Sequence, residues 1–101
     1  MKVVRNGKLY NTETAKLIGS DSFGQYGSSN HWGEELYLKK TGEFFLYGYG
    51  GYYSKYAKQV DSNSWSGSEK IIPLTESEAK AWAEKHLDGD EYIEAFGEVS
   101  E

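Results

Sequence analysis

The chain has 101 residues, no cysteine and a net charge of −5 at pH 7, which is a usual size for one domain. The missing cysteines exclude disulfides and thiolate metal sites, and no stretch approaches the roughly 20 apolar residues of a membrane span. Residues 1–7 lack the apolar core of a signal peptide, so we expect a cytoplasmic protein that does not contact a membrane.

The first predicted element is a tight β-hairpin with strands at about residues 2–5 and 8–11. Asn6 and Gly7 form its turn, because a type I′ turn needs positive φ at both central positions and Asn-Gly tolerates it best.

The next segment is less clearly patterned. Residues 14–20 fit a third strand, although residues 13–16 fit a helical turn equally well. Residues 20–33 are rich in Ser, Gly and Asn and predict a loop. We expect its aromatic residues to fold back onto the sheet; they are Phe23, Tyr26, His31 and Trp32.

A second hairpin is predicted at residues 35–39 and 43–47, where apolar and polar residues alternate with period two around a Gly42 turn. One phase places Leu36, Leu38, Phe44 and Leu46 on the core face. The opposite face then carries Tyr37, Phe45, Tyr47 and Tyr49.

Residues 44–56 contain seven aromatic residues and three glycines. Such a run predicts a strand that ends in a loop presenting flat, amphipathic rings, and these surfaces bind partners more often than they catalyse reactions. We expect Tyr52 and Tyr53 to be the exposed pair. Residues 48–67 have no clear periodicity, and Ile71 with Ile72 either adds a strand edge or pins the chain before Pro73.

The C-terminal segment predicts two helices. Thr75 and Glu78 form a capping box, and an apolar stripe follows with helical spacing, made of Ala79, Trp82, Ala83, His86 and Leu87. Asp88 then caps a short second helix that ends at Gly97. We expect Trp82 to dock the first helix on the sheet.

Together these elements predict an α+β fold. A small antiparallel sheet of four or five strands carries one main and one short C-terminal helix on one face. We expect a single domain over residues 1–101, with a β-rich part at 1–72 and a helical, acidic end at 75–97.

Catalytic and metal-binding patterns are missing from the sequence. His31 and His86 are the only imidazoles, and they show no zinc or EF-hand spacing. His86 lies on the helical stripe, where a core-edge or capping role is favoured over catalysis. Glu34 and Glu35 are neighbours in a strand, so they point to opposite faces and cannot act as a carboxylate pair. The prediction is a protein that is not an enzyme and has no cofactor.

Charge is distributed unevenly along the chain. Residues 75–101 carry two basic and nine acidic side chains, a net charge of −7. Such an end attracts basic protein surfaces and repels nucleic-acid phosphates. We therefore predict a protein partner with a basic surface, disfavour duplex DNA, and expect a monomer or weak dimer.

The predicted contact residues come from two segments. Those on the loop side are Tyr49, Tyr52, Tyr53, Tyr56 and Trp65, and those on the helical side are Glu84, Asp88, Asp90, Glu91 and Glu94. The alternative is a binder of single-stranded nucleic acid or carbohydrate that uses the tyrosine face of the sheet. Its cations would be Lys39, Lys40, Lys55 and Lys58.

Three segments carry a resemblance to a known family. They are residues 6–15 (NGKLYNTETA), residues 45–51 (FLYGYGG) and residues 71–76 (IIPLTE) leading into the Trp82 helix. On these the chain resembles a small, largely uncharacterised protein family that recurs in Gram-positive bacteria, their phages and integrative elements. The resemblance covers most of the chain and assigns no catalytic residues. It implies a context in which short acidic proteins inhibit host defence nucleases by occupying basic nucleic-acid clefts, as anti-CRISPR proteins do.

Overall fold

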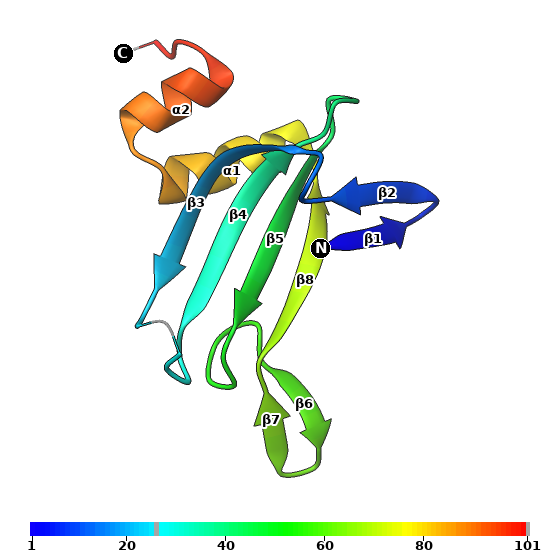
Figure 1. Cartoon of the computed structure of the whole chain (residues 1–101). Helices are drawn as coiled ribbons and strands as arrows, with labels where there is room; N and C mark the ends of the chain where they lie inside the picture. The colour runs from blue at the N-terminus through cyan, green and yellow to red at the C-terminus, as the bar shows by residue number, and fades with distance from the viewer. Residues whose placement is uncertain (26, 101) are drawn as a thin grey trace.

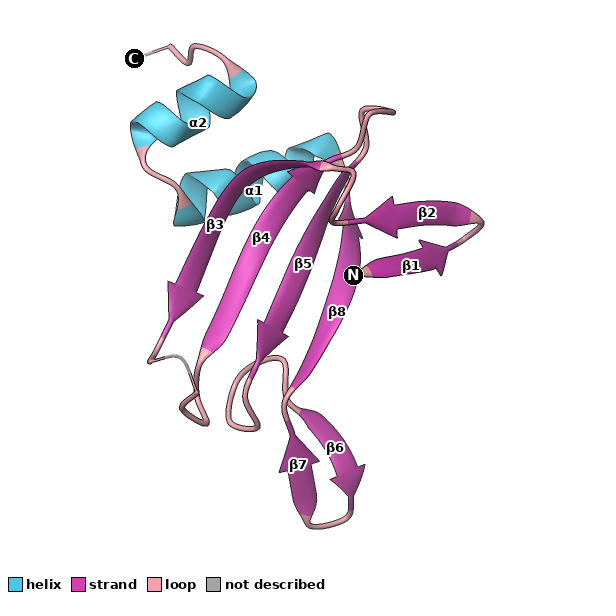
Figure 2. Cartoon of the chain, viewed as in Figure 1, coloured by secondary structure: helices cyan, strands magenta, loops and turns pink. Residues whose placement is uncertain are grey.

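The computed structural model describes residues 1–25 and 27–100, so Tyr26 and Glu101 lie outside it. It confirms the predicted α+β class: eight strands and two helices form one four-stranded sheet, two small hairpins and a helical C-terminal part (Figure 2). The elements in chain order are β1 (Lys2–Arg5), β2 (Lys8–Asn11), β3 (Lys16–Phe23), β4 (Trp32–Leu38), β5 (Phe44–Gly50), β6 (Lys58–Asp61), β7 (Ser64–Ser66), β8 (Ser68–Leu74), α1 (Glu76–His86) and α2 (Gly89–Phe96).

The main sheet is antiparallel with strand order β3-β4-β5-β8, and α1 lies across one of its faces (Figure 1). Leu36 pairs with Leu46 and Leu38 pairs with Phe44, which confirms the register and facing predicted from the alternating pattern. Leu36 and Leu46 are buried beneath α1 together with Ala79. This side is the helix face of the sheet; the other side is the open face.

Both helices begin at capping boxes: the one at Thr75 was predicted, whereas at the second helix only the Asp88 cap was predicted. Thr75 Oγ1 accepts the Glu78 backbone N–H while the Glu78 side chain accepts the Thr75 N–H, and Asp88 and Glu91 repeat the arrangement at α2. Each box satisfies amide groups that the first helical turn leaves unpaired. α1 buries Ala79 and Ala83 completely, so its backbone approaches the sheet closely.

The β1–β2 hairpin has the predicted turn, with Asn6 at φ 53° and Gly7 at φ 77°. It packs against the open face at one end of the sheet, where the Tyr10 ring meets the edge of Phe45 at 5.4 Å between centroids. Tyr10, Tyr37, Phe45 and Ile71 form this second core. The hairpin covers only part of the open face.

An ion cluster ties the hairpin to the β4–β5 turn. Glu43 accepts hydrogen bonds from Lys8 Nζ at 2.7 Å and Lys39 Nζ at 3.2 Å, as well as from the Thr41 hydroxyl. The hydrogen bond from Lys8, with those from Thr41 and Lys39, lowers the pKa of Glu43 from 4.5 to about 2.

The acid stability of the chain should depend on this carboxylate. Because its pKa is lower in the folded state, the stabilisation is complete above pH 4.5 and is lost as the pH falls toward about 2. We expect Glu43→Gln to flatten the fall of the unfolding midpoint between these values in urea titrations. Glu13→Gln, at an acidic residue outside the cluster, is the control. An unchanged acid limb in Glu43→Gln would show that the cluster adds no stability.

One prediction for the strands was wrong, and the structure decides another that was left open. Residues 20–33 are not all loop, because β3 continues through Phe23 and β4 begins at Trp32. β3 is an outer strand with a bulge between Leu17 and Gly19, and an outer strand pairs through its backbone without needing an apolar sequence. Of the two alternatives for Ile71 and Ile72, the strand at the edge of the sheet is confirmed: both belong to the seven-residue outer strand β8, which contains Pro73.

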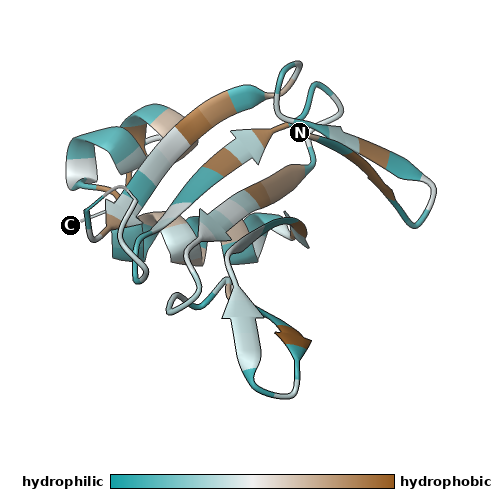
Figure 3. Ribbon diagram, turned by 60° about the horizontal axis from the view of Figure 1, so that its bottom comes forward, coloured by the Kyte–Doolittle hydropathy of each residue, from teal (hydrophilic) through white to brown (hydrophobic). Residues whose placement is uncertain are grey.

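The β6–β7 hairpin was not predicted, because residues 48–67 show no clear periodicity. The hairpin projects from the end of the sheet, and Figure 3 shows a hydrophobic segment on β6. Val60 lies at a bulge between Gln59 and Asp61 and is exposed, as is Trp65 on β7. These apolar side chains therefore serve no core in the described part of the chain.

Neither described helix is long and apolar enough to cross a membrane.

Candidate functional site

The segment after β5, residues 51–57 (the Tyr52 loop), is fixed by its own backbone contacts. The Gly51 N–H donates to the His31 carbonyl at 2.8 Å, and the Tyr53 N–H donates to the Ser29 carbonyl at 2.7 Å. Within the loop, Ser54 Oγ accepts the Tyr56 N–H at 3.1 Å. A methyl group on Gly51 would lie 2.5 Å from the Ser29 carbonyl oxygen, so only glycine allows the two segments to approach this closely.

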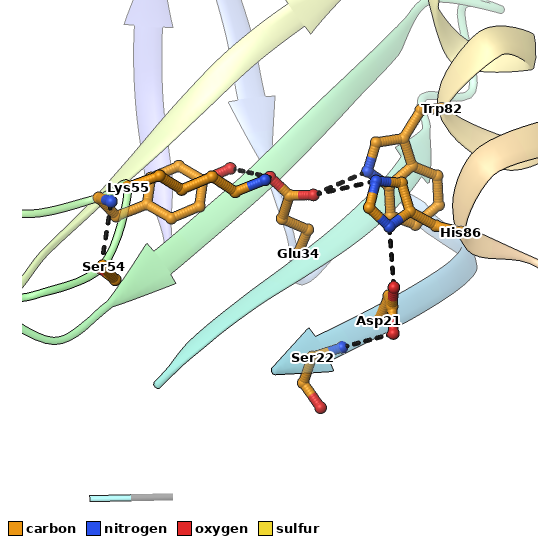
Figure 4. A network of polar contacts seen from close by, with 8 residues as sticks. Asp21, Ser22, Glu34, Ser54, Lys55, Trp82 and His86 are labelled. Carbon is orange, nitrogen blue, oxygen red and sulfur yellow. Dashed lines mark hydrogen bonds and ion pairs between the residues drawn. The ribbon is translucent and has the colours of Figure 1, made fainter. Parts of the chain in front are cut away.

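A buried carboxylate holds the far side of the loop. Glu34 on β4 is 3% exposed and lies between the sheet and α1 (Figure 4). Lys55 Nζ contacts its Oε2 at 2.8 Å and Trp82 Nε1 donates to its Oε1 at 2.9 Å. The Tyr56 hydroxyl also donates to Oε2. One carboxylate therefore joins the Tyr52 loop to helix α1.

Two effects act in opposite directions on the ionisation of Glu34. Burial alone would raise its pKa, but the hydrogen bonds from Lys55, Tyr56 and Trp82 together outweigh burial and lower the pKa below 4.5. Burial and the hydrogen bond to Glu34 raise the pKa of Tyr56 above 10. At neutral pH the pair is therefore a phenol donating to a carboxylate.

His86 extends the contacts of Glu34 to β3. Its Nδ1 donates to Asp21 Oδ2 at 2.8 Å and its Nε2 lies 3.7 Å from Glu34 Oε1. Its ring stacks on Trp82 at 4.7 Å between centroids. We call Asp21, Glu34, Lys55, Tyr56, Trp82 and His86 the Glu34 cluster. Its contacts connect β3, β4, the Tyr52 loop and α1, so the role that the geometry supports is positioning.

The interpretation of Tyr56 as a surface contact was wrong. Its ring is 5% exposed and lies across Gly48, where a methyl group would be 2.1 Å from the Tyr56 Cζ. Because Gly48 has no side chain, the Tyr56 side chain can lie over it on the helix face of the sheet and reach Glu34. Trp82 packs on the core beneath α1, as predicted.

The open face carries tyrosines next to carboxylates. Glu35 points to this face and accepts the Tyr37 hydroxyl at 2.6 Å, while Glu34 points to the helix face, as the alternation predicted. The Tyr47 hydroxyl donates to Glu69 on the neighbouring strand. Tyr49 pairs with Gly33, and a methyl group there would meet the Tyr49 ring at 2.4 Å.

This arrangement weakens the nucleic-acid alternative. Lys39 is paired with Glu43 and Lys55 with Glu34, so two of the four predicted cations are engaged within the fold. The tyrosines of the open face have Glu35 and Glu69 beside them, and carboxylates repel phosphate.

The remaining predicted contact residues divide into two groups. Tyr52 and Tyr53 are exposed, Tyr53 to 77%, which confirms the predicted pair; Trp65 is exposed on β7. The five predicted acidic residues are exposed on α1, α2 and their connection. Figure 1 places the Tyr52 loop and β6–β7 at one end of the molecule and α2 at the other. The structure therefore does not unite them in one contact surface.

Sequence reasoning missed the Glu34 cluster as a unit. One signal was available: Glu34 occupies the inward phase of β4, in line with Leu36 and Leu38. An acidic residue at a core position needs buried partners. His86 on the apolar stripe of α1 was the matching signal. Lys55 and Tyr56 gave none, because the loop conformation brings them to Glu34.

The comparisons with family models, curated proteins and solved structures found no significant match for this chain.

Proposed function

We propose that the protein is a small protein-binding module whose anchor is the exposed Tyr52–Tyr53 pair. One observation supports this most directly: the fold uses a buried carboxylate, Glu34, to hold the loop that presents these rings. The contacts of Glu34 fix the loop although the Tyr52 and Tyr53 rings themselves stay exposed to solvent, so the loop holds these rings at the surface.

A rigid loop with exposed aromatic rings has favourable binding energetics. Tyrosine offers a large amphipathic contact area, and a loop already fixed loses little conformational entropy on association. The Tyr52 and Tyr53 rings lie 5.0 Å apart between centroids, so they form one continuous contact area. Aromatic residues of this kind dominate the affinity of many protein interfaces.

The charge of the chain supports a basic partner. The net charge is −5, so a basic surface would be attracted to the chain as a whole over a distance before the loop makes contact. The specific form of the proposal is inhibition of a host defence nuclease by occupying its basic nucleic-acid cleft. This agrees with the resemblance to a family of mobile-element proteins. That the chain belongs to this family is part of the proposal.

The test is a cleavage assay with purified RNA-guided defence nucleases in the presence of the protein. We expect the wild type to inhibit at least one of them and Tyr52→Ala/Tyr53→Ala to weaken binding by about 30-fold, which is the loss of one hot spot of about 2 kcal/mol. Leu9→Ala, at another exposed apolar residue, should bind like the wild type. If the double variant inhibits with wild-type affinity, the loop is not the anchor. If the wild type inhibits none of the nucleases, the partner is not a defence nuclease of this kind.

A further inference from the structure

A second surface, independent of the Tyr52 loop, lies at the opposite end of the molecule. It is a groove of about 420 Å³ between the end of α1, α2 and the C-terminal segment. Its lining, which defines the α1–α2 groove, is Glu84, Leu87, Asp88, Gly89, Tyr92, Ile93 and Val99. The floor is therefore mainly apolar and its rim carries carboxylates.

The apolar groups of this groove are not fully used in folding. α2 attaches through Phe96, whose ring lies 5.7 Å from that of Phe44 and beneath Lys80. None of its residues is buried. Ile93 remains 41% exposed and Val99 58% exposed. Apolar side chains gathered in a groove and left in solvent indicate an interaction surface.

The charged residues that line the groove have a single sign. Glu84 and Asp88 line it, and Asp90 and Glu94 lie one turn apart on α2, bordering the face of Ile93. Residues 88–101 contain no lysine or arginine. Among the described residues, none of these four carboxylates forms an ion pair with a cation.

We propose that the α1–α2 groove binds a basic amphipathic helix of a partner protein, with apolar side chains seated against Leu87, Ile93 and Val99 and lysines or arginines facing the rim. An amphipathic helix in an apolar groove is a recurring mode of recognition. Charge selects the partner: the four carboxylates attract a cationic helix, whereas a second copy of this chain would bring the same carboxylates against them.

The probe is a labelled helical peptide with leucine on one face and lysine on the other, titrated into the full chain labelled with ¹⁵N. We expect amide shifts confined to residues 84–99 and an affinity that falls as salt rises. Ile93→Gln should weaken binding about tenfold, as expected for the loss of one apolar contact, and Asp90→Asn/Glu94→Gln should weaken it and reduce its salt dependence. Val4→Gln, at an exposed apolar residue on β1, is the matched control and should leave binding unchanged.

Several results would overturn the proposal. They are equal binding of a peptide with glutamate in place of lysine, shifts that map to other parts of the chain, unchanged affinity in Ile93→Gln, or concentration-dependent dimerisation through this surface in sedimentation. Ile93 is largely in solvent, so its variant should stay folded; if circular dichroism shows otherwise, the shifts in the wild type decide. Peptide binding must also survive in Tyr52→Ala/Tyr53→Ala, which separates this groove from the loop.

Discussion

Glu34→Ala should destabilise the fold by about 3 kcal/mol, because it removes the acceptor of two buried donors at once. The Tyr56 hydroxyl and the Trp82 indole N–H both point at this carboxylate, and α1 and the sheet shield the space around it from water. Lys55 is half exposed and should turn to solvent at little cost. Urea unfolding followed by tryptophan fluorescence measures the loss.

Two comparisons separate the network from general effects of substitution. Glu34→Gln keeps an acceptor oxygen and nearly the same volume, so we expect a smaller loss, about 1–2 kcal/mol. Glu35→Ala, next in sequence but on the open face, removes the acceptor of a single part-buried donor, the Tyr37 hydroxyl, and should lose only about 1 kcal/mol. If Glu34→Ala unfolds at the same urea concentration as Glu35→Ala, the buried carboxylate does not hold the loop and the helix together.

Gly48→Ala should cost about 3 kcal/mol or more, although it adds one methyl group. That methyl would lie 2.1 Å from the Tyr56 ring, and the ring cannot move away without losing its hydrogen bond to Glu34. We expect a lower unfolding midpoint, together with faster hydrogen exchange at the Tyr52 loop amides.

The matched background for this variant is Tyr56→Ala. Without the ring, the clash at position 48 disappears, and Gly48→Ala should then be nearly neutral. A double-mutant cycle measures this coupling directly. Equal costs of Gly48→Ala in both backgrounds would show that the Tyr56 ring is not the reason for the glycine.

The parts of the fold that local chemistry determines could be predicted from the sequence. The Asn6–Gly7 turn, the alternation of Leu36 and Leu38, the Thr75 capping box and the Asp88 cap each depend on residues close together in the chain. Each carries a backbone or periodicity preference strong enough to act alone. The docking of α1 through Trp82 could be predicted from the apolar stripe with helical spacing that contains this residue.

The site depends on contacts that local patterns do not encode. Trp82 lies 48 positions from Glu34, and His86 lies 65 positions from Asp21. Tyr56 belongs to a run of aromatic residues, and their composition does not show which ring is buried. Tyr56 is buried because its ring fits over Gly48 and its hydroxyl reaches Glu34. Residues 20–23 were predicted as loop because an outer strand pairs through its backbone, and this pairing does not require a pattern of apolar side chains.

The two outer strands of the main sheet also restrict how the protein can associate. β3 is interrupted by its bulge and carries Asp21, and β8 contains Pro73, which has no backbone N–H to offer. Neither border is a good template for another chain to extend the sheet by β-augmentation. A partner of the proposed surfaces would therefore be recognised through side chains, and the same outer strands disfavour edge-to-edge pairing between copies of the chain.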